Sequence, residues 1–262
     1  MKPIVSEANP HFRRWLRIAG AARAVREEAC TLAEGLHLAE AALDAAVAVE
    51  AVLLRRGSAH AQIDALLERL PREVVRYELS PALYERLAPV EQGAGLILVV
   101  PIGGSPLPAA ARADMVYLDG VQDPGNVGAL LRSAAAAGVQ HVLAGPGTAA
   151  LWAPKVLRAA MGAHFRLQLH ERVPAGQLAG ALDGIWIAAL AHDAPPLWGV
   201  EFPPSPVGWI FGGEGGGISA GARAASRLQV CIPTSNAVES LNVAAAAAIC
   251  LFERARRRAA LP

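Results

Sequence analysis

The feature that most constrains the fold is a regular alternation in the second half of the chain, where short apolar runs are separated by helical patterns. Strands that are apolar at every position are typical of parallel sheets with helices on both faces, because both sides of each strand are buried. The runs are Met115–Asp119, Val139–Ala144, Phe165–Leu169, Ile185–Leu190, Val207–Phe211 and Val230–Ile232. The helical segments are Asn126–Ala137, Ala153–Met161 and a final one from about Val238 to Arg258. This pattern predicts an α/β fold with a mostly parallel sheet.

The N-terminal part of the chain alternates in the same way and predicts a second, smaller α/β unit. Its expected strands are Val49–Leu54, Val74–Tyr77 and Leu96–Val100. Its expected helices are His11–Arg23, Ala33–Ala48, Ser58–Leu70 and Ser80–Leu87. The segment Pro101–Asp114, rich in proline and glycine, follows and is typical of a linker. The sequence therefore predicts two domains, at residues 1–105 and 112–262.

Composition excludes several classes of protein. With 53% hydrophobic and 18% charged residues among 262, the chain can bury a proper core, and a net charge of +1 argues against a histone-like nucleic-acid coat. Its most apolar stretch, Gly95–Val100, is strand-sized and far short of the roughly 18 residues of a membrane span. Cys30, Cys231 and Cys250 are too scattered for a disulfide framework or a metal site. Because the N-terminus also has no apolar leader, we expect a reduced, cytoplasmic, metal-free protein that does not bind membranes.

Basic residues are concentrated near the N-terminus. Residues 1–26 contain one acid, Glu7, and six basic residues, of which five are arginines. These arginines are Arg13, Arg14, Arg17, Arg23 and Arg26. Such a cluster is either a solvated helix face or an RNA-binding surface.

Three polar constellations follow expected strands in the second domain. In the first, Leu118–Val139, a strand ends in a loop rich in Gly, Pro, Asp and Asn, and a helix begins. Ligands of open α/β sheets lie at the carboxyl ends of strands, and a helix N-terminus there favours anions. We expect Asn126 at or near the helix cap and Arg132 inside the helix, facing inward and needing an anionic or polar partner. The alternative is a simple cap and a surface arginine.

The second constellation, Trp209–Ser219, is a strand that runs into five glycines around Glu214. Glycines allow the backbone to approach a ligand closely. A dinucleotide-binding loop is a poor interpretation, because that fingerprint belongs after the first strand of such a unit. The alternative is a flexible turn with a solvated Glu214.

The third constellation, Val230–Glu253, joins a strand to an almost purely apolar helix through a polar loop. Ser240 is the expected N-cap, but capping does not explain a second polar group, Asn242, two residues later. A helix this apolar must be buried in the core or in a subunit interface.

Taken in this order, the three constellations resemble the signature motifs of the SpoU (TrmH) family of RNA ribose 2′-O-methyltransferases, in the SPOUT superfamily. The match consists of Asn126 with Arg132, then Phe211-Gly-Gly-Glu214-Gly, then Ile232-Pro233 with Ser240-Leu241-Asn242, and it covers about residues 115–254. The stretches Val25–Leu43 and Gln92–Val100 look like the family's N-terminal L30e-like substrate-binding extension, on fewer fixed residues.

The resemblance implies a parallel sheet whose C-terminal segment forms a trefoil knot, and S-adenosylmethionine bound in the knotted loops without metal. Gly212, Ile232 and Leu241, with Leu190 or its neighbour Ala189, would line the cofactor, largely through backbone groups. The implied catalytic residues are Arg132, as the base or its organiser, Asn126, which orients Arg132 or the RNA, and Glu214, Ser240 and Asn242 on the substrate side. Because an arginine side chain stays protonated in proteins, we expect Arg132 instead to grip an RNA phosphate and polarise the 2′-hydroxyl.

The resemblance also implies a homodimer with the site at its interface. The implied substrate is structured RNA, with the N-terminal extension favouring rRNA over tRNA, in either a housekeeping or an antibiotic-resistance role. The rival interpretation is a non-catalytic RNA-binding protein on the same fold, against which the five polar positions argue.

Overall fold

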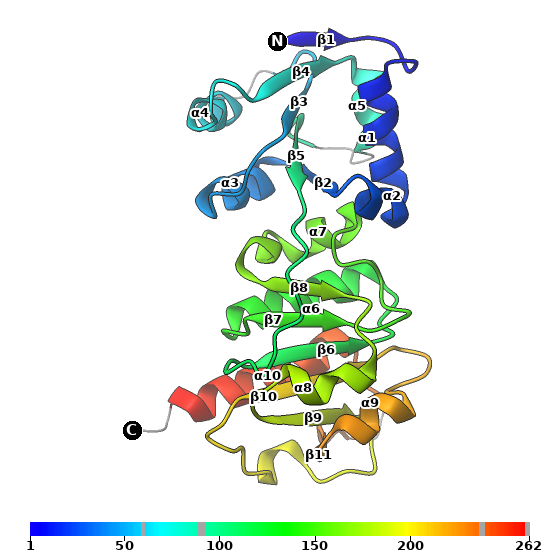
Figure 1. Ribbon diagram of the computed structural model, residues 1–262, viewed down its shortest axis with the longest axis vertical. Coiled ribbons are helices and arrows are strands. Elements are labelled where there is room, and N and C mark those ends of the chain that lie inside the picture. Colours follow the sequence, from blue (N-terminus) through cyan, green and yellow to red (C-terminus); the bar gives the residue numbers. More distant parts are fainter. Residues whose placement is uncertain (59–60, 89–92, 236–238, 260–262) are drawn as a thin grey trace. The chain divides into compact units, whose positions relative to one another are not determined.

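The computed structural model describes residues 1–58, 61–88, 93–235 and 239–259, and the chain divides into two compact units (Figure 1). The first unit comprises Met1–Gly103 and Trp152–Phe165, and the second comprises Gly104–Leu151 and Arg166–Pro262. No helix of the described segments is long and apolar enough to cross a membrane.

The first unit is built on a mixed five-stranded sheet in the order β1-β4-β3-β5-β2. Parallel pairs join β1, β4 and β3, whereas β5 pairs antiparallel with both β3 and β2. The strands are β1 (Lys2–Ile4), β2 (Cys30–Glu34), β3 (Ala51–Arg55), β4 (Val75–Leu79) and β5 (Leu96–Pro101). The helices are α1 (Pro10–Gly20), α2 (Ala22–Glu27), α3 (Leu36–Asp44), α4 (Ala61–Arg69) and α5 (Pro81–Leu87).

Two differences from the sequence prediction have local causes. The helix expected at Ala33–Ala48 begins only at Leu36, because Gly35 adopts a φ of +96° at its N-cap and Ala33 belongs to β2. The helix expected at His11–Arg23 is interrupted at Ala21, whose extended backbone (φ −144°, ψ 121°) separates α1 from α2. Neither β1 nor β2 was expected, because three residues and a Cys-Thr start give no strand pattern.

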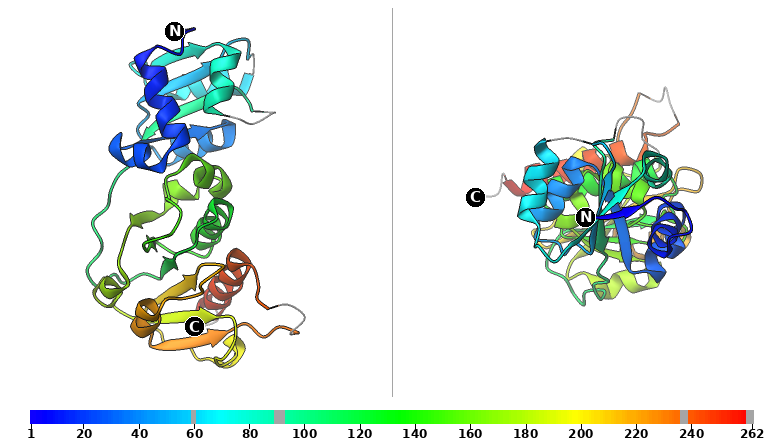
Figure 2. Two further views of the ribbon diagram at one scale, coloured as in Figure 1. Left: turned by 90° about the vertical axis from the view of Figure 1, so that its right-hand side faces the viewer. Right: turned by 90° about the horizontal axis from the view of Figure 1, so that it is seen from above.

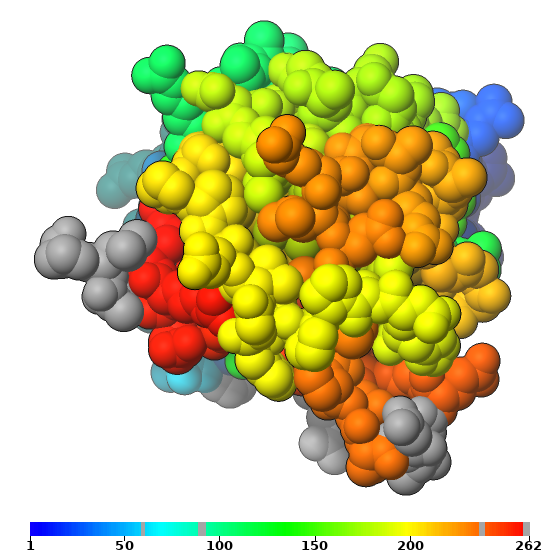
Figure 3. Space-filling model, turned by 90° about the horizontal axis from the view of Figure 1, so that it is seen from below, coloured from blue at the N-terminus to red at the C-terminus, as the bar shows by residue number. Residues whose placement is uncertain are grey.

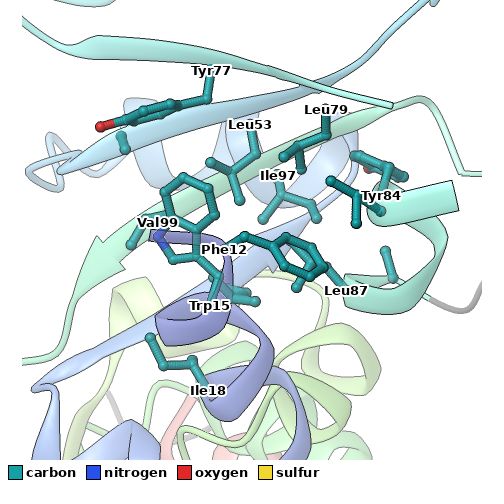
Figure 4. Close-up of a cluster of buried hydrophobic side chains, with 14 of the residues drawn as sticks. Phe12, Trp15, Ile18, Leu53, Tyr77, Leu79, Tyr84, Leu87, Ile97 and Val99 are labelled. Atoms are coloured by element: carbon teal, nitrogen blue, oxygen red, sulfur yellow. The ribbon is translucent and has the colours of Figure 1, made fainter. Parts of the chain in front are cut away.

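Apolar cores lie on both faces of this sheet. On one face, α1 and α5 bring Phe12, Trp15 and Tyr84 against side chains of β3, β4 and β5 (Figure 4). On the other face, α3 and α4 contribute Leu38 and Leu66, among others.

A segment that follows β7 of the second unit completes this second core. Its helix α7 (Pro154–Ala160) places Leu157, which is fully buried, among the side chains of β2, β3, β5, α3 and α4. The Thr31 hydroxyl of β2 donates a 2.8 Å hydrogen bond to the carbonyl oxygen of Trp152, and Arg158 lies 3.3 Å from the Glu34 carboxylate. Residues 152–165 thus group with the N-terminal unit, although their place in the chain falls within the expected range of the second domain.

The second unit has a six-stranded sheet in the order β11-β9-β10-β6-β7-β8, and every pairing in it is parallel. The strands are β6 (Met115–Asp119), β7 (His141–Ala144), β8 (Gln168–Glu171), β9 (Ile185–Leu190), β10 (Val207–Gly212) and β11 (Leu228–Cys231). Figure 2 shows α6 (Pro124–Ala136) and α10 (Val243–Ala259) on one face of the sheet, and α8 (Leu178–Ala181) and α9 (Ala220–Ala225) on the other. The predicted parallel α/β sheet is confirmed. The strand expected at Phe165–Leu169 begins only at Gln168, after a 3-10 turn at Ala163–Arg166.

The C-terminal helix α10 is fixed to the sheet by a buried arginine. The Arg254 side chain donates 2.8 Å hydrogen bonds to the carbonyl oxygens of Pro203 and Ser205, and its Nε lies 3.4 Å from Oδ2 of Asp114. Asp114 in turn accepts from the backbone N–H of Val207 (2.9 Å). Arg254 is 4% exposed and Asp114 8%. The end of α10 is thereby joined to the residue before β6 and to the start of β10, and Figure 3 shows α10 (red) beside the 197–206 segment (yellow).

Candidate active site

Three side chains from distant parts of the sequence form a continuous hydrogen-bonded chain at the carboxyl edge of the second sheet. Asn126 lies in the first turn of α6, Glu214 in the loop after β10, and Asn242 immediately before α10. The Asn242 side-chain amide donates to Oδ1 of Asn126 (2.9 Å), and the Asn126 amide donates to Oε1 of Glu214 (2.6 Å). The predicted convergence of these three residues is therefore present in the fold.

The hydrogen bonds between these three side chains all run in one direction, which is set by the N-terminus of α10. Oδ1 of Asn242 accepts from the backbone N–H groups of Ala244 and Ala245, at 3.0 and 3.2 Å. Its amide nitrogen is thereby turned toward Asn126, and each amide passes a donor on toward the Glu214 carboxylate. Hydrogen bonds aligned in this way polarise one another, and the positive end of the helix supports the first of them. The carboxylate of Glu214 is thus the acceptor end of the chain.

Asn126 lies near the cap of α6, as expected, but neither Asn126 nor Ser240 is a cap residue. Asp123, not Asn126, caps α6, because its Oδ1 accepts from the N–H of Asn126 (2.7 Å). Asn242, not Ser240, caps α10, which begins at Val243 rather than near residue 238. Residues 236–238 lie outside the described segments. Because Asp123 caps α6, the Asn126 side chain is not used in capping and can bridge the two other polar groups.

Arg132 does not join this chain. It is exposed on α6 rather than facing inward, so the expectation of a buried guanidinium is wrong. Within the described segments, no hydrogen bond or ion pair engages it. Six helical residues turn a side chain by about 240° and advance it by about 9 Å, which carries Arg132 around the helix from Asn126.

A cleft of about 470 Å³ opens beside the polar chain, within the size range of small-molecule sites. All four residues expected to line a cofactor are on its wall: Leu190, Gly212, Ile232 and Leu241. Glu214, Ser240 and Asn242 also line it. Sequence reasoning missed further lining residues, among them His192, Thr234 and Glu239, because loop residues without a motif give no signal before the fold is known.

The glycine loop, residues 212–217, forms one wall of the cleft and is tightly fitted against its own backbone. A Cβ on Gly212 would lie 2.2 Å from the carbonyl carbon of Gly217, and one on Gly213 would lie 2.2 Å from the carbonyl oxygen of Gly120. Glycine at position 212 was expected to leave space for a ligand. The structure gives a different reason, which is that the loop folds back on that position.

Tyr117 of β6, outside the lining of the cleft, is a fixed neutral donor. Burial, with the nearby Asp119 charge, raises the pKa of Tyr117 to about 12. Its hydroxyl donates to the carbonyl oxygen of Val173 (3.1 Å) and fills the space beside Gly145. Tyr117 therefore stays protonated near neutral pH and has a structural role.

The five N-terminal arginines lie on α1 and α2 of the first unit, where carboxylates of the described residues engage at least three of them. Arg14 contacts both Glu28 (2.7 Å) and Glu50, Arg17 contacts Glu28 (2.6 Å), and Arg23 contacts Glu27 (2.6 Å). The Arg14 hydrogen bond lowers the pKa of Glu28. Arg26 also has a contact, whereas Arg13 is exposed and has no partner among the described residues.

No group of three or more His, Cys, Asp and Glu side chains in the described segments is arranged to hold a metal ion. Cys30, Cys231 and Cys250 are all free.

Comparisons with known proteins agree with this geometry. Residues 114–252 match the SpoU rRNA Methylase family. The protein of Bacillus subtilis (strain 168) named 23S rRNA (guanosine(2553)-2′-O)-methyltransferase RlmP is 31% identical over 260 residues, 96% of this chain and 98% of that protein. The protein of Nitrosomonas europaea named 23S rRNA (guanosine-2′-O-)-methyltransferase RlmB is 37% identical over 145 residues, 55% of this chain and 56% of that protein.

Solved structures extend the likeness to the whole chain. A crystal structure described as an RNA 2′-O ribose methyltransferase has a TM-score of 0.81 and 29% identity, covering 99% of this chain and 100% of that one. The SpoU methyltransferase AviRb of Streptomyces viridochromogenes, solved with AdoMet, has a TM-score of 0.86 at 23% identity, covering 97% of this chain and 100% of that one.

Proposed function

The chain belongs to the SpoU rRNA methylase family, and we propose that it transfers a methyl group from S-adenosylmethionine to a ribose 2′-hydroxyl of rRNA. The observation that carries the proposal is the hydrogen-bonded chain of Asn126, Glu214 and Asn242 on the rim of a cleft of cofactor size. S-adenosylmethionine is the cofactor of this family.

The residues of the cleft fit this cofactor. Its lining is divided between apolar groups and backbone, with Leu190, Ile232 and Leu241 on the apolar side and the glycine loop on the other. Apolar lining with a few convergent polar groups is the usual character of such sites. We propose that backbone groups of Leu190, Gly212, Ile232 and Leu241 hold the cofactor, and that no metal takes part.

The chemistry follows from what each side chain can do. The cofactor supplies a methyl group on a positively charged sulfur, which a ribose 2′-hydroxyl attacks in line, so positioning contributes much of the rate. The guanidinium of Arg132 remains charged near neutral pH, so its proposed role is to grip an RNA phosphate and polarise the hydroxyl. Asn126, Glu214, Ser240 and Asn242 would orient the ribose at the rim. A non-catalytic RNA-binding protein would have no use for this aligned set.

Two further proposals concern the fold of the N-terminal unit and the path of the C-terminal segment. We infer that the first unit is L30e-like and binds RNA, and that the C-terminal segment passes through a trefoil knot. Support comes from a fully parallel sheet with α10 packed directly on α6, and from the whole-length likeness to 2′-O-methyltransferases. Relatives named for 23S rRNA favour rRNA over tRNA as the substrate. Modification of rRNA and three free cysteines both fit a cytoplasmic protein.

A homodimer is proposed from the outer face of α10. Ala245 and Phe252 are exposed, and Ile249 is half-buried, at positions that share one side of the helix. Phe252 is 48% exposed, and an apolar stripe of this kind on a packed helix is typical of a subunit interface. Because α10 packs on α6, a dimer formed over this stripe brings Arg132 close to the interface.

Incubation with tritiated S-adenosylmethionine and ribosomal RNA tests the function. Label should enter RNA and be recovered, after nuclease digestion, as a 2′-O-methylated nucleoside identified by mass spectrometry. Comparing rRNA with tRNA separates the two substrate classes. Label that appears on a base rather than on a ribose would contradict the proposal.

Replacement of Gly212 by alanine should abolish measurable binding of S-adenosylmethionine in titration calorimetry. The added Cβ has no room against the 217–218 backbone, so the wall of the cleft must shift. Overpacking of this kind costs about 1–3 kcal/mol. Gly216→Ala is the matched control, since a Cβ there meets nothing within 4 Å and should leave binding unchanged. Equal affinities of the two variants would contradict this account.

Replacement of Arg13 by alanine should weaken RNA binding and lower the slope of log affinity against log salt by about one unit. Arg13 is exposed and has no partner in the described structure, so its charge is available to a phosphate. Arg69→Ala is the control, because Asp44 already pairs with that arginine. Filter binding over a salt series measures both variants, and an unchanged Arg13→Ala slope would exclude this contact.

A further inference from the structure

The glycine loop, which forms one wall of the cleft, makes few interactions of its own that could hold it in one conformation. The glycine loop contains five glycines, which lose more conformational freedom on ordering than other residues do, and it has almost no side chains to pack. One bond within the loop, from the N–H of Gly217 to the carbonyl oxygen of Gly213 (2.9 Å), closes it on itself. Its shape must therefore be held by groups outside it.

Asp119, the last residue of β6, supplies such groups at both ends of the loop. Its carbonyl oxygen accepts from the N–H of Gly213 (2.9 Å), where β6 and β10 pair in register as Asp119 with Gly212. Its carboxylate accepts from the N–H of Ser219 at 2.6 Å, just beyond the loop. A carboxylate bond to a backbone N–H is charge-assisted and roughly twice as strong as a neutral one.

Asp119 acts from behind the cleft, since it is absent from the lining, which includes Gly212, Gly213, Glu214, Gly217 and Ile218. Any effect of its side chain on a ligand must therefore pass through the loop. The loop also positions Glu214, the acceptor end of the polar chain.

We propose that Asp119 is a positioning residue, whose carboxylate holds the glycine loop in its cofactor-binding shape before the cofactor arrives. The inference rests on the proposed function, because it assigns that loop to cofactor binding. Preorganisation of this kind raises affinity by removing the cost of ordering the loop on binding. None of the three motifs contains Asp119 as a reacting group, and an Asp-Gly pair after a strand gives only a turn signal.

Four variants separate the carboxylate bond from general damage. Asp119→Ala removes the acceptor, whereas Asp119→Asn keeps a side-chain oxygen in its place. Ser219→Pro removes the N–H donor at a φ of −62°, which proline adopts, and Ser219→Ala keeps that donor while losing the cap of α9. Thermal unfolding of each ligand-free variant checks that the fold is retained.

Calorimetry with S-adenosylmethionine should show a roughly ten- to hundred-fold loss of affinity for Asp119→Ala and Ser219→Pro. Asp119→Asn and Ser219→Ala should remain within about fivefold of the wild type. The double variant Asp119→Ala/Ser219→Pro should be no weaker than either single variant, because both remove the same bond.

Hydrogen exchange of the ligand-free protein gives an independent readout. In Asp119→Ala the amides of residues 213–219 should exchange roughly tenfold faster, while those of β6 and β7 are unchanged. Unchanged loop exchange, wild-type affinity of Asp119→Ala, or equal losses in Ser219→Ala and Ser219→Pro would overturn the inference. Wild-type protein that does not bind S-adenosylmethionine would instead contradict the proposed function, and the exchange data would still decide whether Asp119 holds the loop.

Discussion

Replacement of Arg132 by alanine should lower methyl transfer by two orders of magnitude or more, while fold and affinity for S-adenosylmethionine stay at wild-type levels. Arg132 is exposed, outside the cleft and without a partner in the described segments, so its removal leaves nothing unpaired in the protein. Its charge is free for an RNA phosphate beside the ribose. Removal of one preorganised donor that stabilises developing charge typically costs about 10²–10³-fold, and lost positioning of the RNA adds to that.

Two further variants show whether the effect is specific to the guanidinium of Arg132. Arg132→Lys keeps the charge but not the planar fork, and we expect it to recover little activity. Arg227→Ala removes another exposed arginine and should stay within about twofold of wild type. Arg227 lies immediately before β11, at the amino-terminal ends of the parallel strands, whereas the site lies at their carboxyl ends. Transfer of tritiated methyl groups to rRNA measures all three. Turnover of Arg132→Ala within about threefold of wild type would make Arg132 an ordinary surface residue.

Replacement of Arg254 by methionine should lower the free energy of unfolding of the second unit by about 3–5 kcal/mol. Methionine fills much of the space but leaves the carbonyl oxygens of Pro203 and Ser205 without their donors, and Asp114 keeps only its contact with the more exposed Arg258 among the ion pairs of the described segments. Chemical denaturation at a fixed protein concentration measures the change, since a dimer adds a concentration dependence.

Arg256→Ala is the matched control on the same helix. Arg256 is exposed and its bonds are to Glu253, three residues earlier on α10, which keeps its second partner, Arg257, when Arg256 is removed. Ion pairs with a solvent-exposed arginine contribute about 0–1 kcal/mol. A destabilisation of Arg254→Met no larger than that of Arg256→Ala would show that the buried arginine does not anchor α10.

Much of the second unit could be predicted from sequence because its signals are local. Uninterrupted apolar runs identified β6, β9 and β10 nearly to the residue, and polar residues after such strands must meet at one edge of a parallel sheet. The resemblance to the family's three motifs assigned Asn126, Glu214 and Asn242 to one site, and the structure brings them together. Strand order and the orientations of the side-chain amides depend on contacts between residues far apart in the sequence. Local sequence patterns carry no information about such contacts.

The predictions that were wrong also have physical causes. Asp123 and Asn126 are both good caps within one loop, and only the backbone geometry decides between them. Arg132 was expected to face inward from its alanine neighbours, but alanine tolerates exposed and buried faces alike. In the first unit, Gly35 and Ala21 interrupt helical patterns through backbone angles that composition does not reveal.

The membership of α7 in the first unit has a consequence for synthesis on the ribosome. Domains generally fold as units from the N-terminus while the chain is being made. Here the N-terminal sheet lacks Leu157 and the Trp152 carbonyl partner of Thr31 until β6, α6 and β7 of the following unit, and then α7 itself, have been translated. A nascent or truncated chain that stops at the linker carries an open apolar face. The last step in completing the first unit therefore belongs to a segment encoded within the second.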